Sequence, residues 1–183
     1  MPQSIVLFDV DNLTIPALNA LPQSQRDPVS LAQKTGKHLL DIAKCQGQIV
    51  SAYAAIALRR SFLPEALVQR CQALAIADTL VNIGYNVILV PMEPNIADRE
   101  LCKIAYECMR EASINAYVIG TGDGQEPFYS LFSDLERARL YVHVVVWDVV
   151  QHVVRFSEVF RVSRLCDTFK DHIDGNQEAQ FSP

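Results

Sequence analysis

Short apolar runs alternate along this chain with segments of helical length. The runs are rich in branched side chains and predict buried strands at residues 5–8, 48–56, 85–90, 116–120 and 142–147. The intervening segments predict helices at residues 31–45, 64–83, 97–112 and 127–139. Because the strands are apolar throughout, both faces of the sheet should be covered. We therefore expect a three-layer α/β fold, with a mostly parallel central sheet of about five strands flanked by helices.

Three segments lie outside this alternation. Residues 13–28 contain three prolines and predict a long surface loop beside the sheet edge, suited to cover a site or to pair with another subunit. Beyond the fifth strand, residues 149–156 and 162–169 predict two short helices, with extended chain at 159–161 between them. The polar residues 173–183 predict a disordered tail, which leaves one domain spanning residues 1–172.

The composition suits a single intracellular domain. With 183 residues and 50% hydrophobic content, the chain can bury one substantial core. Its net charge of −5 attracts no polyanion as a whole, so any contact with nucleic acid must come from a local patch. The five cysteines form no C-x-x-C pair and mostly occupy apolar helical positions, which predicts reduced core thiols in a cytoplasmic protein. No signal peptide is expected, and no apolar stretch approaches the roughly 20 residues of a membrane span.

Carboxylates follow two of the predicted strands, and the carboxyl ends of parallel strands share one edge of a sheet. Asp9 and Asp11 come after the first strand and should project to the same side of the extended chain. Asp123 follows the fourth strand between two glycines, which allow close approach of the backbone to a ligand. Such acids also occur as ordinary caps and turn residues. Their shared position at the sheet edge favours a functional site.

A further acid is predicted to reach the same edge from a helix. Asp98 lies one turn before Leu101, on the apolar stripe and at the amino end of the helix expected at 97–112. The alternative is an exposed first-turn acid that complements the helix dipole. Converging carboxylates need cations or raised pKa values to offset their repulsion. Asp9, Asp98 and Asp123 are therefore candidate ligands of a hard divalent cation, Mg²⁺ or Mn²⁺, whose bound water could attack a phosphodiester.

The order of these motifs resembles that of the NYN domain family, a branch of the PIN-like metal-dependent nucleases. The similar features, over roughly residues 4–170, are Asp9-x-x-Asn12 after an apolar strand, the helix-borne Asp98, the run Thr121-Gly122-Asp123-Gly124, and a closing helix near Leu165 and Phe169. The resemblance implies a PIN-like fold and a metal-dependent ribonuclease acting on RNA. Its catalytic and metal-binding residues would be Asp9, Asp98 and Asp123. Asn12 and Thr121 would support them.

The chain departs from the family pattern after Gly124. The family usually continues with a second acid, where this chain has Gln125 followed by Glu126. Glu126 and Asp11 are therefore further candidate metal ligands, whereas Asp148, after the fifth strand, is more typical of a cap. The missing acid also supports a second hypothesis, a degenerate module that binds RNA or a protein partner without cutting. A homodimer would suit either version.

Basic residues near the same edge are candidates for RNA contact. Arg59 and Arg60 follow the second strand, and Phe62 is available to stack on a base. Arg99 and Lys103, on the helix expected at 97–112, are weaker candidates. Paired arginines are also common on an ordinary solvated surface.

A phosphatase motif, a dinucleotide site and a histidine metal site are each less consistent with this sequence. Asp9 and Asp11 nearly match the Asp-x-Asp-x-Thr motif of haloacid-dehalogenase phosphatases, as nucleophile and general acid, but Thr14 is one position late. A dinucleotide site is disfavoured because no Gly-x-Gly-x-x-Gly follows the first strand. His38, His143, His152 and His172 show no metal-ligand spacing. His143, within a strand, is expected to be a hydrogen-bonded core residue.

Overall fold

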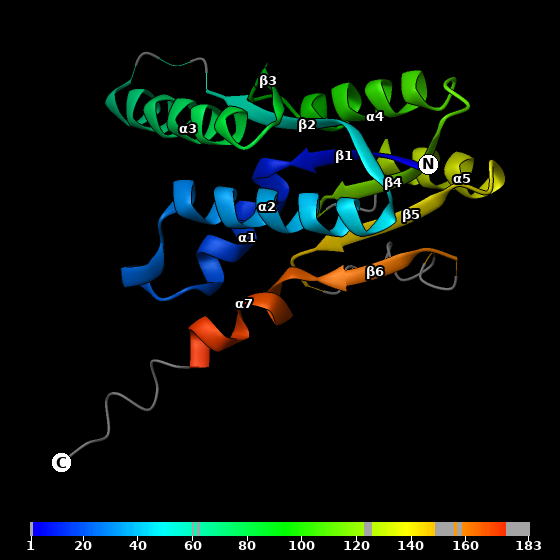
Figure 1. Cartoon of the computed structure of the whole chain (residues 1–183). Helices are drawn as coiled ribbons and strands as arrows, with labels where there is room; N and C mark the ends of the chain where they lie inside the picture. The colour runs from blue at the N-terminus through cyan, green and yellow to red at the C-terminus, as the bar shows by residue number, and fades with distance from the viewer. Residues whose placement is uncertain are drawn as a thin grey trace.

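Six strands form one sheet in the computed structural model, which describes residues 2–59, 61, 63–122, 126–148, 156 and 159–174, the last five by their backbone alone (Figure 1). The strands are β1 (Gln3–Asp9), β2 (Gln48–Leu58), β3 (Asn86–Pro91), β4 (Ile114–Gly120), β5 (Tyr141–Val146) and β6 (Arg161–Arg164). Their order is β3-β2-β1-β4-β5-β6, and every pairing is parallel. The expected α/β fold is confirmed, with a wholly parallel sheet and one strand more than predicted.

The strand order changes direction between β1 and β4, which are neighbours in the sheet although they are distant in the sequence. The chain adds β2 and β3 on one side of β1 and then returns to add β4, β5 and β6 on the other side. In open α/β sheets a crevice forms outside the carboxyl ends of the strands at such a reversal. The ends of β1 and β4 are therefore the place to look for a site.

Helices cover both faces of the sheet. They are α1 (Val10–Ala20), α2 (Pro28–Gln46), α3 (Pro64–Asn82), α4 (Ile96–Cys108), α5 (Phe128–Arg137) and α7 (Leu165–Asp174). The first three lie on one face and α4 and α5 lie on the other, as Figure 1 shows. The arrangement is a three-layer, Rossmann-like fold. Among the described residues, no helix has both the length and the apolar character needed to cross a membrane.

Alternate residues of β1 supply the two halves of the core. Val6 and Phe8 pack among the side chains of α1, α2 and α3, whereas Ile5 and Leu7 pack with α4 and α5. All four are fully buried. Because side chains of a strand alternate between the faces, Asp9 follows Leu7 onto the α4 side. Continuous burial of β1 thus decides the direction in which its terminal carboxylate points.

The prediction of a long surface loop at residues 13–28 is wrong. Helix α1 begins directly after Asp9 and is followed by a short 3-10 turn, η1 (Gln23–Gln25), before Asp27 caps α2. Leu13 and Ala17 are buried against the sheet, so tertiary packing holds the helix despite the proline within it. Pro16 was the misleading signal, because an interior proline usually ends a helix.

The carboxyl-terminal elements also differ from those expected. Of the extended chain predicted at 159–161, only Arg161 is extended, because residues 159 and 160 form a turn whose backbone N–H groups donate to the Phe156 carbonyl. Arg161 begins β6, so residues 162–164, predicted as helix, pair with β5 instead. Helix α7 starts only at Leu165. Residues 149–155 and the tail from 175 lie outside the described part of the chain. The prediction of core thiols holds for Cys102, which is buried, but is wrong for Cys45 and Cys71, which are exposed on their helices.

His143 is held between two strands, as predicted for a hydrogen-bonded residue. Its Nε2 lies 2.9 Å from the Ser163 hydroxyl oxygen on β6. Burial lowers the pKa of His143 to about 4, and the nearby positive charges of Arg161 and His38 act in the same direction. Since the usual value is 6.5, the unfolded chain binds more protons than the folded chain between about pH 4 and 6.5.

We therefore expect the free energy of unfolding to fall as the pH is lowered through this window. His143 should contribute a slope of at most about 1.4 kcal/mol per pH unit. Urea unfolding at several pH values should show a shallower slope for His143→Gln, which keeps a hydrogen-bonding side chain but cannot titrate. Equal slopes for the two proteins would contradict this assignment.

Candidate metal centre

Asp9 ends β1 and also caps the helix that follows. Its Oδ1 accepts a hydrogen bond from the Asn12 backbone N–H at 3.3 Å, and its Oδ2 accepts one from the Asn12 side-chain amide at 2.6 Å. The Asp-x-x-Asn motif is thus a helix cap in which the backbone N–H and the side-chain amide of Asn12 both donate to the Asp9 carboxylate. We expected Asp9 and Asp11 to project to the same side of an extended chain. This expectation is wrong, because helix α1 begins at Val10, between the two residues.

Asp98 meets Asp9 from the opposite layer. It occupies the first turn of α4 and is only 5% exposed, so it is not a solvated first-turn acid. The carboxyl groups of Asp98 and Asp9 share a hydrogen bond. The Asn12 amide also lies 3.4 Å from Asp98 Oδ1 and thereby bridges the two acids. Of the predicted convergence of Asp9, Asp98 and Asp123, the approach of Asp9 and Asp98 is present, and Asp123 lies outside the described residues.

The environment of this pair disfavours two negative charges. Burial raises the pKa of Asp9 well above its usual range, and the hydrogen bond and like charge of Asp98 raise it further. Only the two hydrogen bonds from Asn12 act in the opposite direction. Two buried carboxylates in contact must share a proton or a cation. The pair is therefore chemically suited to exchange a proton for a metal ion.

Asp11 is held in a different contact. Its Oδ2 accepts a hydrogen bond from the Ala57 backbone N–H at 2.8 Å, near the carboxyl end of β2. Burial raises the pKa of Asp11, and this hydrogen bond partly offsets the rise. The Asp11 carboxylate therefore ties the start of α1 to β2, and the structure does not bring it into the Asp9–Asp98 pair.

The end of β4 approaches the pair through Gly122. Thr121, fully buried, donates its backbone N–H to the Val145 carbonyl at 3.0 Å. A Cβ on Gly122 would lie 2.5 Å from the Asn12 carbonyl oxygen, so only glycine fits there. In a regular helix that oxygen would accept from residue 16, but Pro16 has no N–H. Asp123 follows Gly122 directly but, with Gly124 and Gln125, lies outside the described residues.

Glu126 stands at the start of α5, on the same side of the sheet. Its carboxylate accepts a hydrogen bond from the Ser130 hydroxyl at 2.8 Å and is exposed. Burial raises the pKa of the Cys102 thiol to about 12, and the charges of Asp98, Glu126 and Asp9 add to the effect in that order. The three acids thus lie within electrostatic reach of one thiol. In the part of the chain that the structure describes, however, no three His, Cys, Asp or Glu side chains are placed to hold a metal ion.

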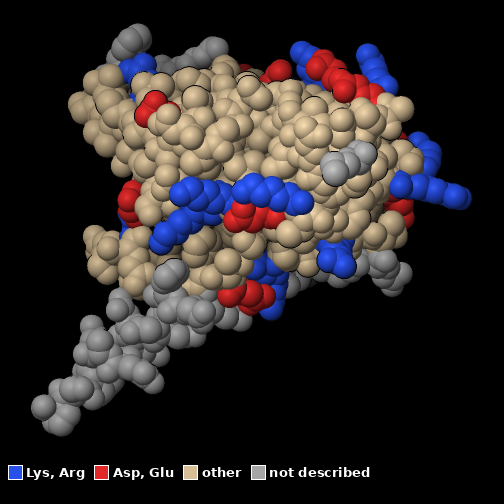
Figure 2. Space-filling view, in the orientation of Figure 1, with Lys and Arg blue, Asp and Glu red and all other residues tan. Residues whose placement is uncertain are grey.

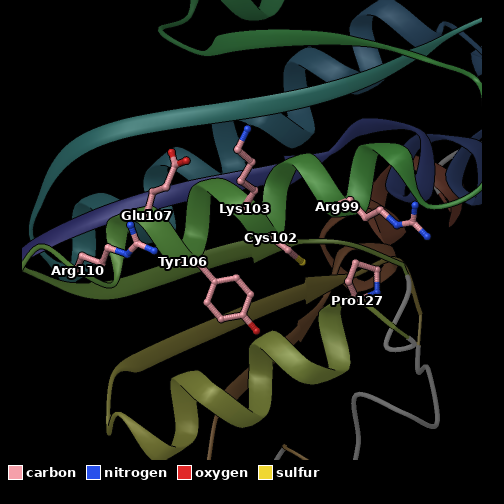
Figure 3. A pocket seen from close by; sticks show the side chains of 7 residues that line it. All are labelled: Arg99, Cys102, Lys103, Tyr106, Glu107, Arg110 and Pro127. Atoms are coloured by element: carbon pink, nitrogen blue, oxygen red, sulfur yellow. The ribbon is translucent and has the colours of Figure 1, made fainter.

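A pocket of about 390 Å³ lies along α4, between this helix and the start of α5 (Figure 3). Its lining consists of Arg99, Cys102, Lys103, Tyr106, Glu107, Arg110 and Pro127. Tyr106 points toward α5 in Figure 3 and donates its hydroxyl to Asp134 at 3.0 Å. Arg99 and Lys103 were expected from the sequence, whereas Tyr106 and Arg110 were not. Tyr106 and Arg110 follow Lys103 by three and seven residues, a helical spacing that was the available signal.

The remaining predicted residues lie around the same edge or outside the described residues. Arg59 is exposed directly after β2, and Asp148 is exposed two residues after β5. Arg60 and Phe62 belong to the positions that the structure does not describe. Nothing in the described contacts joins Arg59 to the acid pair.

Removal of the Asn12 amide should destabilise the protein when no metal is present. Asn12→Ala removes the side-chain amide that lies between the two buried carboxyl groups, while the backbone N–H at position 12 stays, and this should cost about 1–3 kcal/mol. For a chain of this size the Tm should fall by roughly 2–4 °C for each kcal/mol. The measurement is thermal unfolding in EDTA. Asn115→Ala, which removes an exposed amide bonded to the Gln3 backbone N–H, is the control and should change the Tm much less. A similar Tm for both variants would contradict the bridging role of Asn12.

No protein-family model, no curated protein and no solved structure matches this chain.

Proposed function

We propose that this chain is a metal-dependent ribonuclease that hydrolyses phosphodiester bonds in RNA, with Mg²⁺ or Mn²⁺ held by Asp9, Asp98 and Asp123. The observation that carries the proposal is the buried Asp9–Asp98 pair at the reversal of the sheet. Asp123 is included because it directly follows Gly122, which contacts Asn12. The NYN-like order of the motifs adds support.

The residues present fit a hard divalent cation. Mg²⁺ takes oxygen ligands, keeps several of its waters and needs only one or two carboxylates. Asp9 and Asp98 supply two such carboxylates, already in contact and anchored from two layers. Neither Lys nor Arg is among the groups that shift the Asp9 pKa. A cation would therefore offset a repulsion that the protein otherwise relieves by a proton.

The chain's own residues have separable roles in this reaction. Asp9 and Asp98 hold the cation, while Asn12 fixes the orientation of the Asp9 carboxylate through two hydrogen bonds. When bound, the cation supplies charge neutralisation at the phosphate and a more acidic water. Glu126, one residue beyond Gln125, provides a carboxylate on the same side and can accept a proton from the attacking water. Gly122 lets the chain that leaves β4 lie directly against the Asn12 carbonyl.

The pocket along α4 suits the RNA strand on either side of the cleaved bond. Arg99 is adjacent to Asp98 in the sequence, and Lys103 follows one turn later along the pocket lining. These cations bind phosphates, and the exposed part of the Tyr106 ring offers a surface for a base. The net charge of −5 would repel a nucleic acid at long range. These local cations can still attract it, because a nucleic acid at the site responds to the nearby field.

A second candidate function is a module that binds RNA without cutting it. Two observations favour it: Gln125 replaces an acid of the family motif, and the described residues assemble only two acids in contact. The phosphatase alternative is weakened, because Asp11, its general acid, accepts a hydrogen bond from Ala57 at the edge of β2.

Metal binding should be visible in thermal stability. We expect Mn²⁺ to raise the Tm of the unsubstituted protein, since a ligand at 100 times its Kd stabilises by about 2.7 kcal/mol. Asp9→Asn and Asp98→Asn should raise the Tm in EDTA, because each removes one ionisable acid from the buried pair, and should respond less to Mn²⁺. Asp41→Asn, which alters an exposed acid paired with Lys44, is the control and should respond like the unsubstituted protein. An equal response in all four proteins would exclude this pair as the metal site.

Cleavage of a labelled single-stranded RNA tests the reaction. Activity should require Mn²⁺ or Mg²⁺, stop with EDTA, and fall at least about 100-fold in Asp9→Asn and in Asp123→Asn. Arg99→Ala with Lys103→Ala should raise KM with little change in kcat, because those cations bind substrate away from the reacting atoms. Lys44→Ala, on α2, serves as the control cation.

The same assay separates the alternatives. RNA binding with metal but no cleavage would favour the non-catalytic module. Release of phosphate from a generic phosphatase substrate, without RNA cleavage, would favour the phosphatase.

A further inference from the structure

Helix α3 is apolar on its outer face as well as on its inner face. Its inner side packs against the sheet and α2 through Ala66, Ala73, Ile76, Ala77 and Leu80. Five large apolar side chains on α3 or just before it are nevertheless exposed: Leu63, Leu67, Val68, Leu74 and Val81. A helix that is apolar all round is normally covered on all sides. The outer face of α3 therefore lacks a cover within this chain's described residues.

The outer residues follow the spacing of a helix-packing seam. Leu67, Leu74 and Val81 recur every seven residues, and Cys71 and Asp78 lie four residues after the first two. This alternation of four and three residues is the pattern by which two helices pack along one line. Leu67, Leu74 and Val81 are each about half exposed, at 47%, 51% and 54%. With 19 residues, α3 offers a seam about 28 Å long.

The surface around the seam is poor in charge. Figure 2, in the orientation of Figure 1, shows that the face over α3 carries few Lys, Arg, Asp or Glu side chains, whereas charged residues gather over α2. Beside α3, the edge strand β3 exposes Leu89. An exposed apolar surface next to an unpaired strand edge is typical of an interaction site.

The charges on α3 indicate what covers this surface. Leu74 lies at the middle of the seam, with Leu67 seven residues before it and Val81 seven after it. Arg70 and Asp78 are also placed symmetrically, four residues before and four residues after Leu74. A twofold axis at Leu74 would set the α3 helices of two copies antiparallel. Each Arg70 would then face Asp78 of the other copy, and each Leu67 would face Val81.

The opposite orientation is unfavourable. In a parallel pair, Asp78 would lie against Asp78 in the middle of an apolar seam, where like charges repel and are poorly solvated. A twofold contact uses the same patch on both copies, so the patch must be complementary to itself. The symmetric placement of one cation, one anion and three large apolar residues about Leu74 meets that condition.

We propose that two copies of this chain form a homodimer by antiparallel packing of α3 against α3, centred on Leu74. This inference is independent of the nuclease proposal. The α3 surface takes the place of residues 13–28 as the expected subunit contact, because those residues form α1 and a 3-10 turn and not the predicted loop. Because the twofold axis reverses the direction of the sheet, the Asp9–Asp98 pairs of the two copies open toward opposite ends of the dimer.

Sedimentation velocity over a range of protein concentrations tests this arrangement. The unsubstituted protein should sediment as a reversible dimer, and Leu74→Glu should weaken the dimer at least tenfold, because it places two negative charges at the axis. The matched control is Ile15→Glu, which changes an equally exposed apolar residue, at 50%, on α1. It should leave the dimer unchanged, and circular dichroism should verify that both variants fold.

Charge exchange tests the register. Arg70→Asp and Asp78→Arg should each weaken the dimer, whereas the double variant should restore it, because the opposed charges are exchanged. Leu74→Cys in a Cys71→Ser background should form a disulfide-linked dimer on oxidation, whereas Gln72→Cys in the same background, off the seam, should not. A protein that stays monomeric at 100 times the concentration used for the RNA assay would overturn the proposal. A dimer unaffected by Leu74→Glu would do so as well.

Discussion

Two buried carboxyl groups in hydrogen-bond contact are the constraint on which the rest of this site depends. Asp9 and Asp98 come from adjacent layers of the fold. Asp9 is the last residue of β1 in the sheet, and Asp98 lies in the first turn of α4 on the helical layer that covers it. Their contact is tolerable only while a proton, a cation or a strong donor offsets the charge. Asn12 is such a donor, but an uncharged one, and it cannot neutralise two acids. The protein thus keeps a destabilising arrangement at the place where a ligand could relieve it.

The architecture explains why this pair can exist. A wholly parallel sheet brings the carboxyl ends of its strands to one edge, and the reversal between β1 and β4 opens that edge to a ligand. Burial of β1 on both faces then directs Asp9 toward α4, because the alternation of its side chains is fixed by the core on each side. The same packing requires glycine at position 122, where the chain leaving β4 touches the Asn12 carbonyl.

The surface chemistry divides the molecule into two regions. Along α4 the side chains that line the pocket include Arg99, Lys103 and Arg110, together with one acid, Glu107. Along α3 the exposed side chains are mainly apolar, and two of its three charged residues, Arg70 and Asp78, are placed symmetrically about Leu74. An acidic protein can still present a cationic strip to a polyanion, because the field of distant charges is screened within about 10 Å at ordinary salt.

Residue order alone determined the alternation of strands and helices, the three-layer class, and the approach of Asp9 and Asp98. Those features follow from periodicities of two and 3.6 residues and from the geometry of parallel sheets, which act locally and repeat along the chain. Tertiary structure decided the rest. Pro16 lies inside a helix because Leu13 and Ala17 are buried against the sheet, and β6 forms because β5 offers a free edge. Asp11 turns to Ala57 because the chain enters α1 one residue after Asp9. Each of these outcomes depends on a partner distant in the sequence, whose position no local pattern encodes.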